Sequence, residues 1–262
     1  GVTAHITDND SPGVIVTESS NTTDVAEGGA TDNYSVVLAT QPTAAVTITL
    51  AGGTHATANV MHLVFTPGNW NIAQVVTVTA VDDAIAEGPH TATIQHSAAS
   101  ADPNYNGIPV QDVTVHIADN DSPGVVVTES NGSTDVTEGG TTDNYSMALT
   151  SQPTGNVTVT VLIGAQATAS PPLLLFTPGN WNIPQDVTVA AVDDAVDEDL
   201  HSATAQHTAV SADLDYNGAA VQDVTVHITD NDTAGVRITE SSSETRVAEG
   251  GFTDNYSVVL LS

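Results

Sequence analysis

The sequence predicts an all-β protein of tandem immunoglobulin-like, seven-stranded Greek-key β-sandwiches arranged end to end. Two observations predict this class. An Asp-Asn-Asp triplet begins at Asp8, Asp119 and Asp230, which gives a fixed period of 119 − 8 = 111 and 230 − 119 = 111 residues. A fixed period indicates one structural module used in tandem. Between turn residues such as Gly, Pro, Asn and Asp, short runs rich in Val and Thr alternate in polarity, as half-buried strands do.

The period divides the 262 residues into two complete modules and two fragments. Residues 1–10 are expected to be the last strand of a preceding repeat, and residues 233–262 the first strands of a third. The complete repeats are residues 11–121 and 122–232. A module of about 110 residues can bury its own core. Because no initiator Met is present and the chain stops within a strand-like run, we expect a segment of a longer array.

Seven strands are expected in the first module, and the second repeats them at the same offset. Their expected ranges are Gly13–Glu18, Asn33–Thr40, Ala45–Leu50, Met61–Phe65, Gln74–Val81, His90–His96 and Gln111–Ile117. The last range alternates clearly, with Val113, Val115 and Ile117 on one face. Pro67-Gly68 favours a tight turn between the fourth and fifth strands. Seven short strands in about 110 residues are typical of an immunoglobulin-like sandwich.

The composition excludes several classes of partner. The chain has 32 acidic residues, two Arg and no Lys, so its net charge is −30. Such a charge argues against nucleic acid and anionic membrane surfaces as partners. Without Cys there are neither disulfides nor thiolate metal sites. Membrane insertion is not expected, because no run of 18 apolar residues occurs.

The acidic residues gather in loops that should meet. In an immunoglobulin-like sandwich, the loops after the first, third and fifth strands lie at one end, where the seventh strand also finishes. The first module places these acids there: Glu27, Asp82, Asp83, Glu87, Asp119 and Asp121. The second repeats them as Glu138, Asp193, Asp194, Glu198, Asp230 and Asp232. Two carboxylates about 5 Å apart repel by roughly 3 kcal/mol at an effective dielectric of 20. A cation would relieve this repulsion, and many oxygen ligands on flexible loops suit Ca²⁺.

These residues also carry a family resemblance that spans both modules. Val-x-Glu-Gly at Val25, Phe-x-Pro-Gly at Phe65, Val-Asp-Asp-x-x-x-Glu at Val81 and Asp-x-Asp at Asp119 together resemble the Calx-β domain. That domain is known from sodium–calcium exchangers, integrin β4 and bacterial surface proteins. The resemblance implies a calcium-binding, seven-stranded sandwich, in which the acids above are ligands. It also implies that the backbone carbonyls of Ile85 and its counterpart Val196 bind the ion.

Two departures from the family pattern lower the expected number of ions. The stretch from Gly53 to Val60 lacks the Asp that regulatory exchanger domains carry in this region, and Asn120 stands in the middle of the closing triplet. We therefore expect one or two calcium ions per site and weaker calcium binding than in the regulatory exchanger domains. Only Ser122, Pro123 and Gly124 separate Asp121 from the next strand, so the connection cannot act as a flexible linker. An ion there is expected to fix the angle between modules.

The function expected is structural: a calcium-stiffened segment of a secreted, extracellular surface protein, such as an adhesin shaft, stalk or fibre. A second hypothesis is a subunit of a self-assembling filament, in which the partial repeats complete like subunits by strand exchange. A calcium sensor and a carbohydrate-binding module are two further hypotheses. The partners expected are calcium and neighbouring repeats of the same chain or of like subunits, while any cell-surface or glycan ligand is unplaced.

No enzyme activity is expected, because no serine, histidine and acid pattern has the context of a nucleophile. His90 and His96 lie six residues apart, roughly 20 Å along a strand, which favours polar surface over a zinc or catalytic site. Trp70 and Trp181 are expected at the edge of the core rather than as platforms for sugars.

Overall fold

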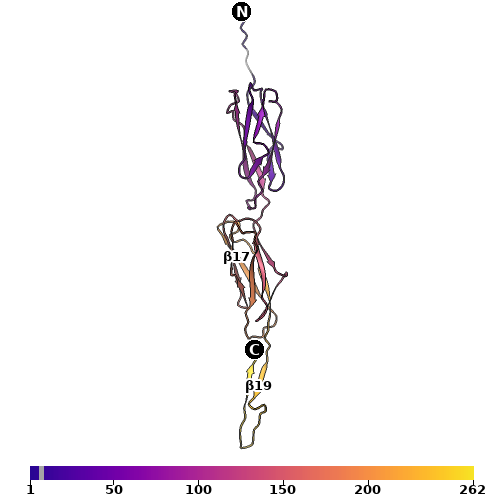
Figure 1. Ribbon diagram of the computed structural model, residues 1–262, viewed down its shortest axis with the longest axis vertical. Helices are drawn as coiled ribbons and strands as arrows, with labels where there is room; N and C mark the ends of the chain where they lie inside the picture. The colour runs from indigo at the N-terminus through magenta and orange to yellow at the C-terminus, as the bar shows by residue number, and fades with distance from the viewer. Residues whose placement is uncertain (6–8) are drawn as a thin grey trace. The chain divides into compact units, whose positions relative to one another are not determined.

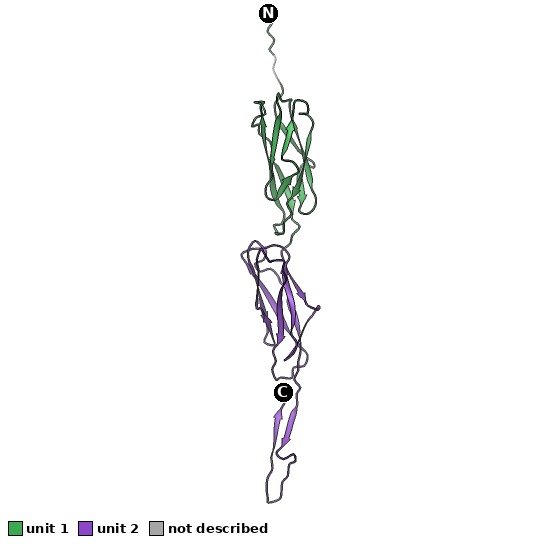
Figure 2. Ribbon diagram, in the orientation of Figure 1, with its two compact units in different colours: residues 1–122 green, residues 123–262 purple. Residues whose placement is uncertain are grey.

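The computed structural model describes residues 1–5 and 9–262 and contains 20 strands. No helix occurs among these described residues, and none of them forms a helix long and apolar enough to cross a membrane. The chain separates into two compact units, residues 1–122 and 123–262 (Figure 2). The expected all-β class of immunoglobulin-like sandwiches is confirmed. Residues 1–5, 9 and 10 form no strand, and the rest of the strand expected at 1–10 lies outside the described residues.

The first unit is a sandwich of a four-stranded and a five-stranded sheet. The four-stranded sheet has the order β1-β3-β7-β5, and the five-stranded sheet has the order β2-β9-β8-β4-β6. The strands are β1 Val14–Glu18, β2 Thr23–Ala26, β3 Asp32–Leu38, β4 Val46–Ala51, β5 Ala56–Ala58, β6 His62–Phe65, β7 Gln74–Ala80, β8 His90–Ser100 and β9 Val113–Ala118. All neighbours are antiparallel except β2 and β9, which pair in parallel from Thr23↔Val115 to Ala26↔Ala118.

The second unit repeats this sandwich and adds a hairpin (Figure 1). Its sheets have the orders β10-β12-β16-β14 and β11-β18-β17-β13-β15. The strands are β10 Val125–Glu129, β11 Thr134–Thr137, β12 Asp143–Leu149, β13 Val157–Ile163, β14 Ala167–Ser170, β15 Leu173–Phe176, β16 Gln185–Ala191, β17 His201–Ser211 and β18 Val224–Thr229. The hairpin joins β19 (Val236–Glu240) to β20 (Tyr256–Leu260) in the register Val236↔Leu260, which is that of β1 and β3 two repeats further on.

Each sandwich has nine strands, two more than the seven expected from the sequence. β2 follows a turn that the sequence suggests as the end of the first strand, and it forms because β9 offers it a parallel edge. β5 is a three-residue strand that pairs with β7, whereas β6 pairs with β4 in the other sheet. Residues 245–248, the counterparts of β2 and β11, form no strand, because the described residues contain no counterpart of β9 beyond them.

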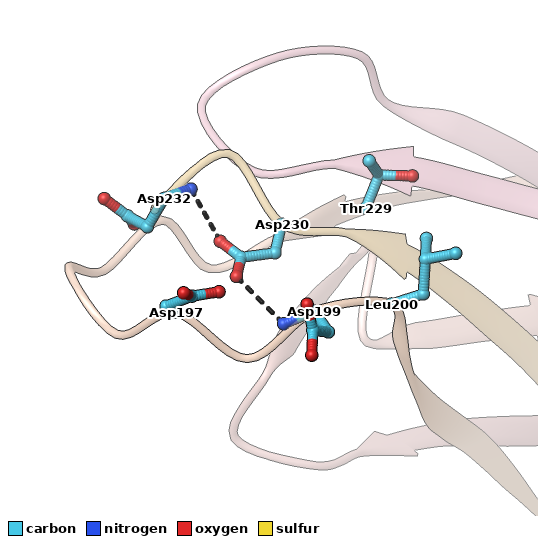
Figure 3. Close-up of a pocket in the computed structure, with 6 residues that line it drawn as sticks. All are labelled: Asp197, Asp199, Leu200, Thr229, Asp230 and Asp232. Carbon is cyan, nitrogen blue, oxygen red and sulfur yellow. Dashed lines mark hydrogen bonds between the residues drawn. The ribbon is translucent and has the colours of Figure 1, made fainter. Parts of the chain in front are cut away.

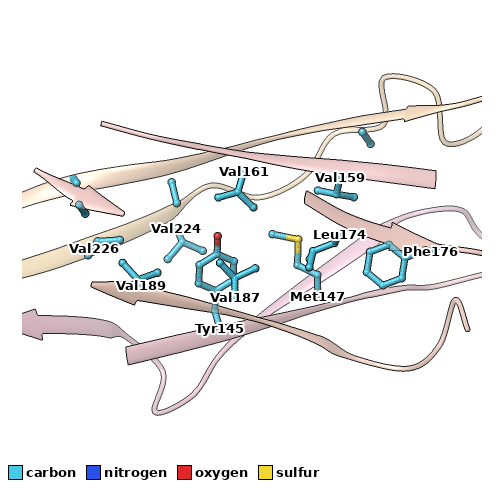
Figure 4. Packing of buried hydrophobic residues seen from close by; sticks show 14 of the residues in the cluster. Tyr145, Met147, Val159, Val161, Leu174, Phe176, Val187, Val189, Val224 and Val226 are labelled. Atoms are coloured by element: carbon cyan, nitrogen blue, oxygen red, sulfur yellow. The ribbon is translucent and has the colours of Figure 1, made fainter. Parts of the chain in front are cut away.

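Apolar side chains of the two sheets meet between them in each unit. In the second unit Tyr145, Met147, Val187 and Phe176 are fully buried, and residues of both sheets surround them (Figure 4). The first unit has the equivalent cluster, including Tyr34 and Phe65. Trp70 and Trp181 are partly buried and pack against these cores, which agrees with a place at the core edge.

A loop with a buried acid lies between β8 and β9, at the end of β8 away from the acidic loops. Asp102 is only 3% exposed, and its carboxylate accepts hydrogen bonds from the backbone amides of Thr43 (2.7 Å) and Asn104 (3.0 Å). Next to it, the Tyr105 hydroxyl donates to the Thr40 carbonyl oxygen at 2.7 Å. The amides of Thr43 and Asn104 lower the pKa of Asp102, although burial acts in the opposite direction.

Asp102→Asn is expected to lower the thermal unfolding midpoint of the first unit by several degrees at neutral pH. Because the folded pKa of Asp102 lies below the unfolded one, its stabilisation is complete above the unfolded value and disappears as pH falls through the folded value. The difference between variant and wild type should therefore be full at neutral pH and vanish as the pH falls well below about 4, the unfolded pKa. Calorimetry across this range tests it, with Asp24→Asn, an exposed site, as the charge-matched control. An equal difference at both ends of the range would contradict the expectation.

Candidate metal centre

Three carboxylates of the first unit meet where β2 and β9 end. Glu27 follows β2, and its backbone amide donates to the Ala118 carbonyl oxygen of β9 at 3.0 Å, so the parallel pairing continues to the site. Asp119 and Asp121 follow β9 directly. Glu27, Asp119 and Asp121 each offer an oxygen atom, and these oxygens lie within 4.8 Å of one another. The sequence placed all three residues at this end, and the structure brings them together.

Backbone amides fix the orientation of Asp119. One carboxylate oxygen accepts hydrogen bonds from the amides of Glu87 (2.7 Å) and Gly88 (2.6 Å), and the other accepts from the amide of Asp121 (2.8 Å). Burial acts to raise the pKa of Asp119, but these three amides outweigh it and the pKa is lowered. Asp119 therefore stays ionised and ties the β7–β8 loop to the end of β9.

Glu27 is a buried carboxylate without partners. Glu27 is only 3% exposed, and neither of its carboxylate oxygens has a hydrogen-bond partner among the described residues. One carboxylate oxygen of Asp121 is also buried and unpaired there. Burial raises the pKa of Glu27, and the charges of Asp119 and Asp83 raise it further. Burial and the charge of Asp119 likewise raise the pKa of Asp121. A cation among these oxygens would remove both the missing contacts and the repulsion.

Asn120 binds two of the loops together. Its side-chain amide donates to the backbone carbonyl oxygen of Glu27 at 3.3 Å and to a carboxylate oxygen of Asp82 at 3.0 Å. Gly28 lies beneath this contact with φ +58°, and a Cβ atom there would stand 3.0 Å from the Asn120 amide nitrogen. Glycine is therefore required twice, by its backbone conformation and by the close approach. The middle residue of the closing triplet therefore holds two acidic loops together rather than offering a third carboxylate.

The second unit repeats this arrangement. Glu138 is 3% exposed with one unpaired, buried carboxylate oxygen, and it groups with Asp230 and Asp232. Asp230 accepts hydrogen bonds from the amides of Glu198 (2.6 Å) and Asp232 (2.8 Å). The side-chain amide of Asn231 donates to the Glu138 carbonyl oxygen at 2.8 Å and to Asp193 at 2.9 Å. Burial and then the charge of Asp230 raise the pKa of both Glu138 and Asp232.

Two further acids enter the second site, and the sequence reasoning missed them. Asp197 and Asp199 line an acidic pocket together with Asp230 and Asp232 (Figure 3). The amide of Asp199 donates to Asp230 at 3.1 Å, and the carboxylate of Asp197 accepts from the amide of Ala234 at 2.7 Å. Their counterparts in the first module are Ala86 and Gly88, so comparison of the repeats could have revealed both residues.

The other predicted ligands lie in the loops between β7 and β8 and between β16 and β17. Asp83 accepts a hydrogen bond from the amide of Ile85 at 2.7 Å, and Asp194 accepts one from the amide of Val196 at 2.8 Å. These bonds shape the loops, while the role of the Ile85 and Val196 carbonyls stays a prediction. The carboxylate of Glu87 turns toward two histidines rather than toward the three grouped acids.

His96 and His207 differ from the polar surface expected of the histidines. Nε2 of His96 lies 2.8 Å from the Tyr34 hydroxyl, and His207 makes the same contact with Tyr145 at 2.9 Å. His207 is 8% exposed, so it belongs to the core. Burial lowers the pKa of both His96 and His207, which favours the neutral rings. These two histidines complete the hydrogen bonding of buried tyrosines.

No model of a protein family matches the chain, and no curated protein matches it. Among solved structures, it is similar to CBD12 of CALX1.2, with 14% identity, a TM-score of 0.37 and coverage of 81% of this chain and 99% of that one. The calcium binding domain CBD12 of CALX1.1 gives 15% identity, a TM-score of 0.37 and the same coverage of both chains. The D00-D0 domain of intimin gives 13% identity and a TM-score of 0.28, covering 83% of this chain and 100% of that one. Likenesses of this size carry no information about function.

Proposed function

We propose that this chain is a calcium-stiffened, tandem-repeat segment of an extracellular surface protein, with a structural rather than an enzymatic role. Each repeat would bind one or two calcium ions among the acids at the end of its last strand. The first site would use Glu27, Asp82, Asp83, Asp119 and Asp121. The second would use Glu138, Asp193, Asp194, Asp230 and Asp232. Glu198 and the carbonyls of Ile85 and Val196 complete the proposed ligand sets, whereas the carboxylate of Glu87 faces two histidines instead.

The buried carboxylates of Glu27 and Glu138 carry this proposal. Both oxygens of Glu27 and one oxygen of Glu138 are buried without a partner among the described residues, and a folded chain rarely leaves buried carboxylate oxygens unpaired because this is costly. Both residues face the two closing Asp side chains of their own repeat. The donors are oxygen atoms from three separate segments, which is the ligand chemistry that calcium prefers. The family resemblance of the motifs points to the same ion.

The stiffening role rests on where the ligands lie in the chain. Asp121 is followed by three residues before the first strand of the next repeat, β10, so an ion that holds Asp121 also restrains the start of that connection. Within the second unit, the loop that carries Asp194 and Glu198 also holds the segment leading to β19, because Asp197 accepts the hydrogen bond from Ala234. The loop proposed to bind the metal is thus connected directly to the segment through which the chain leaves the second sandwich.

Calcium is expected to narrow the distribution of distances between the two repeats. The chain contains no Cys, so Thr93→Cys and Thr204→Cys would place spin labels at equivalent exposed positions of β8 and β17. Pulsed electron paramagnetic resonance in millimolar calcium and in chelator measures the distribution. Asp121→Asn should abolish the narrowing, whereas Asp232→Asn, in the other site, should leave it intact. Equal widths in calcium and chelator, despite calorimetric evidence of binding, would reject stiffening while leaving calcium binding in place.

A self-assembling filament is the second candidate, and the β19–β20 hairpin favours it. Every residue of its two strands is exposed, including Val236 (59%), Ile238 (63%) and Leu260 (72%), whose counterparts in β1 and β3 face a core. A sheet from a like subunit could cover these side chains. Negative-stain electron microscopy distinguishes the two candidates, because filaments that lengthen with protein concentration require assembly, whereas separate particles at every concentration exclude it.

A further inference from the structure

Two histidines and a glutamate of the first unit form a second cluster beside the acidic site. His55 immediately precedes β5, Glu87 lies in the β7–β8 loop and His90 begins β8. Nδ1 of His55 lies 3.3 Å from a carboxylate oxygen of Glu87, and Nε2 of His90 lies 3.4 Å from the same oxygen. The two imidazole rings meet edge to face with centroids 5.1 Å apart. One donor atom from each residue lies within 4.8 Å of the others.

The hydrogen bonding of His90 orients a lone pair into this cluster. Its Nδ1 lies 2.9 Å from the backbone carbonyl oxygen of Gly88, which can only accept, so Nδ1 carries the proton. Its Nε2 is buried and has no hydrogen-bond partner among the described residues. A neutral His90 therefore turns its Nε2 lone pair toward a carboxylate. Histidines that bind metals share this arrangement, with one nitrogen donating to a carbonyl and the other bound to the ion.

Two of the three donor spacings match those around a small tetrahedral ion. Zn²⁺ binds imidazole nitrogen and carboxylate oxygen at about 2.0–2.2 Å, so neighbouring ligands of a tetrahedral site lie about 3.3–3.5 Å apart. The two His–Glu distances of 3.3 and 3.4 Å fall in this range. Calcium ligands stand farther from their ion, at about 2.3–2.6 Å, and are oxygen atoms. Two nitrogen donors therefore favour a transition metal over calcium.

We propose that His55, Glu87 and His90 form a binding site for a divalent transition-metal ion, of which Zn²⁺ is the representative, separate in chemistry from the calcium site. Three protein ligands leave a fourth position for water or another donor. Glu87 then serves the transition metal rather than calcium, in keeping with the direction of its carboxylate. The sequence signal for this site is the His at position 55, which has no counterpart in the second repeat.

The second repeat supplies a natural comparison. Gln166 occupies the position of His55, and its side-chain amide donates a hydrogen bond to Glu198. His201 keeps the relation of His90, with Nε2 3.5 Å from Glu198 and Nδ1 3.1 Å from the Asp199 carbonyl oxygen. The cluster of this repeat is therefore Glu138, Glu198 and His201, with a single imidazole, and the Gln166 amide occupies one oxygen of Glu198. We expect the transition-metal site in the first repeat only.

The test is titration of the whole chain with Zn²⁺ in millimolar calcium, by calorimetry, with Co²⁺ absorption as a readout of ligand geometry. Wild type should bind one Zn²⁺ per chain, and Co²⁺ should give the absorption of a tetrahedral nitrogen and oxygen site. His55→Gln, which copies the second repeat, should weaken binding by at least about tenfold. Gln166→His should add a second Zn²⁺ site. In nuclear magnetic resonance spectra, Zn²⁺ should shift the ring signals of His55 and His90 but not those of His62.

Two outcomes would overturn the proposal. If wild type and His55→Gln bind Zn²⁺ with equal affinity and stoichiometry, the ion sits elsewhere. If Asp121→Asn removes Zn²⁺ binding while His55→Gln does not, Zn²⁺ is only occupying the acidic calcium site. The calcium proposal is judged separately, because the response to calcium of Asp121→Asn is measured without Zn²⁺.

Discussion

Glu27→Gln is expected to change the stability of the first unit in opposite directions with and without calcium. In chelator the variant should unfold at a higher temperature than wild type, because glutamine removes a buried charge that has no hydrogen-bond partner among the described residues. The amide can also donate toward Asp119, whose charge contributes to the raised pKa of Glu27. In calcium the variant should unfold at a lower temperature than wild type, because a charged ligand has been lost.

The calcium response of wild type sets the size of this effect. At a calcium concentration of about 100 times the dissociation constant, binding to the folded state alone adds about 2.7 kcal/mol to the free energy of unfolding. For a domain of roughly this size, that corresponds to a rise of about 10 °C in the unfolding midpoint. Most of that rise should be absent in Glu27→Gln.

Differential scanning calorimetry in calcium and in chelator measures this reversal of the stability difference between Glu27→Gln and wild type. Glu138→Gln is the matched variant, and it should give the same behaviour in the transition of the second unit while leaving the first unchanged. If Glu27→Gln lowers the midpoint equally in both buffers, Glu27 has a packing role and the calcium assignment at this site is wrong.

The sequence predicts most of this fold because the longer strands show a clear alternation of apolar and polar residues, which recurs in both repeats. The alternation of Val113, Val115 and Ile117 marks β9, and each of these side chains is buried. β2 and β5 escape sequence reasoning because four and three residues are too short to show a period. They exist because edges of β9 and β7 are available, which is a property of the assembled sandwich.

The candidate site likewise has residues that the sequence can place and residues that only the assembled sandwich brings together. Glu27, Asp119 and Asp121 could be placed together from loop positions alone, since the loop after the first expected strand and the end of the seventh lie at the same end of such a sandwich. His55 and His90 could not, because they lie 35 residues apart in segments that meet only after β5 pairs with β7. Spacing along one strand argues against histidine ligands, but a ring from another segment supplies the missing partner.

Phe65→Ala is expected to destabilise the first unit by about 3–5 kcal/mol, through lost burial and the cavity left behind. Phe65 is fully buried on β6, in a core separate from that of the second unit. A loss of this size is a large part of the roughly 5–15 kcal/mol that stabilises a typical domain. The unfolding transition of the first unit should therefore move to a much lower temperature or disappear.

The unfolding transition of the second unit in this variant shows whether the repeats are independent domains. If each core supports its own repeat, Phe65→Ala should leave the second transition in place, and Phe176→Ala should produce the mirror result. Val64→Ala, at a neighbouring position that is 47% exposed, should change either transition little and so controls for the substitution itself. Calorimetry in chelator measures the stability of the two cores without a contribution from bound metal. A shift of both transitions by Phe65→Ala would mean that the repeats unfold as one cooperative unit, and that stability passes through the short connection after Asp121 even without calcium.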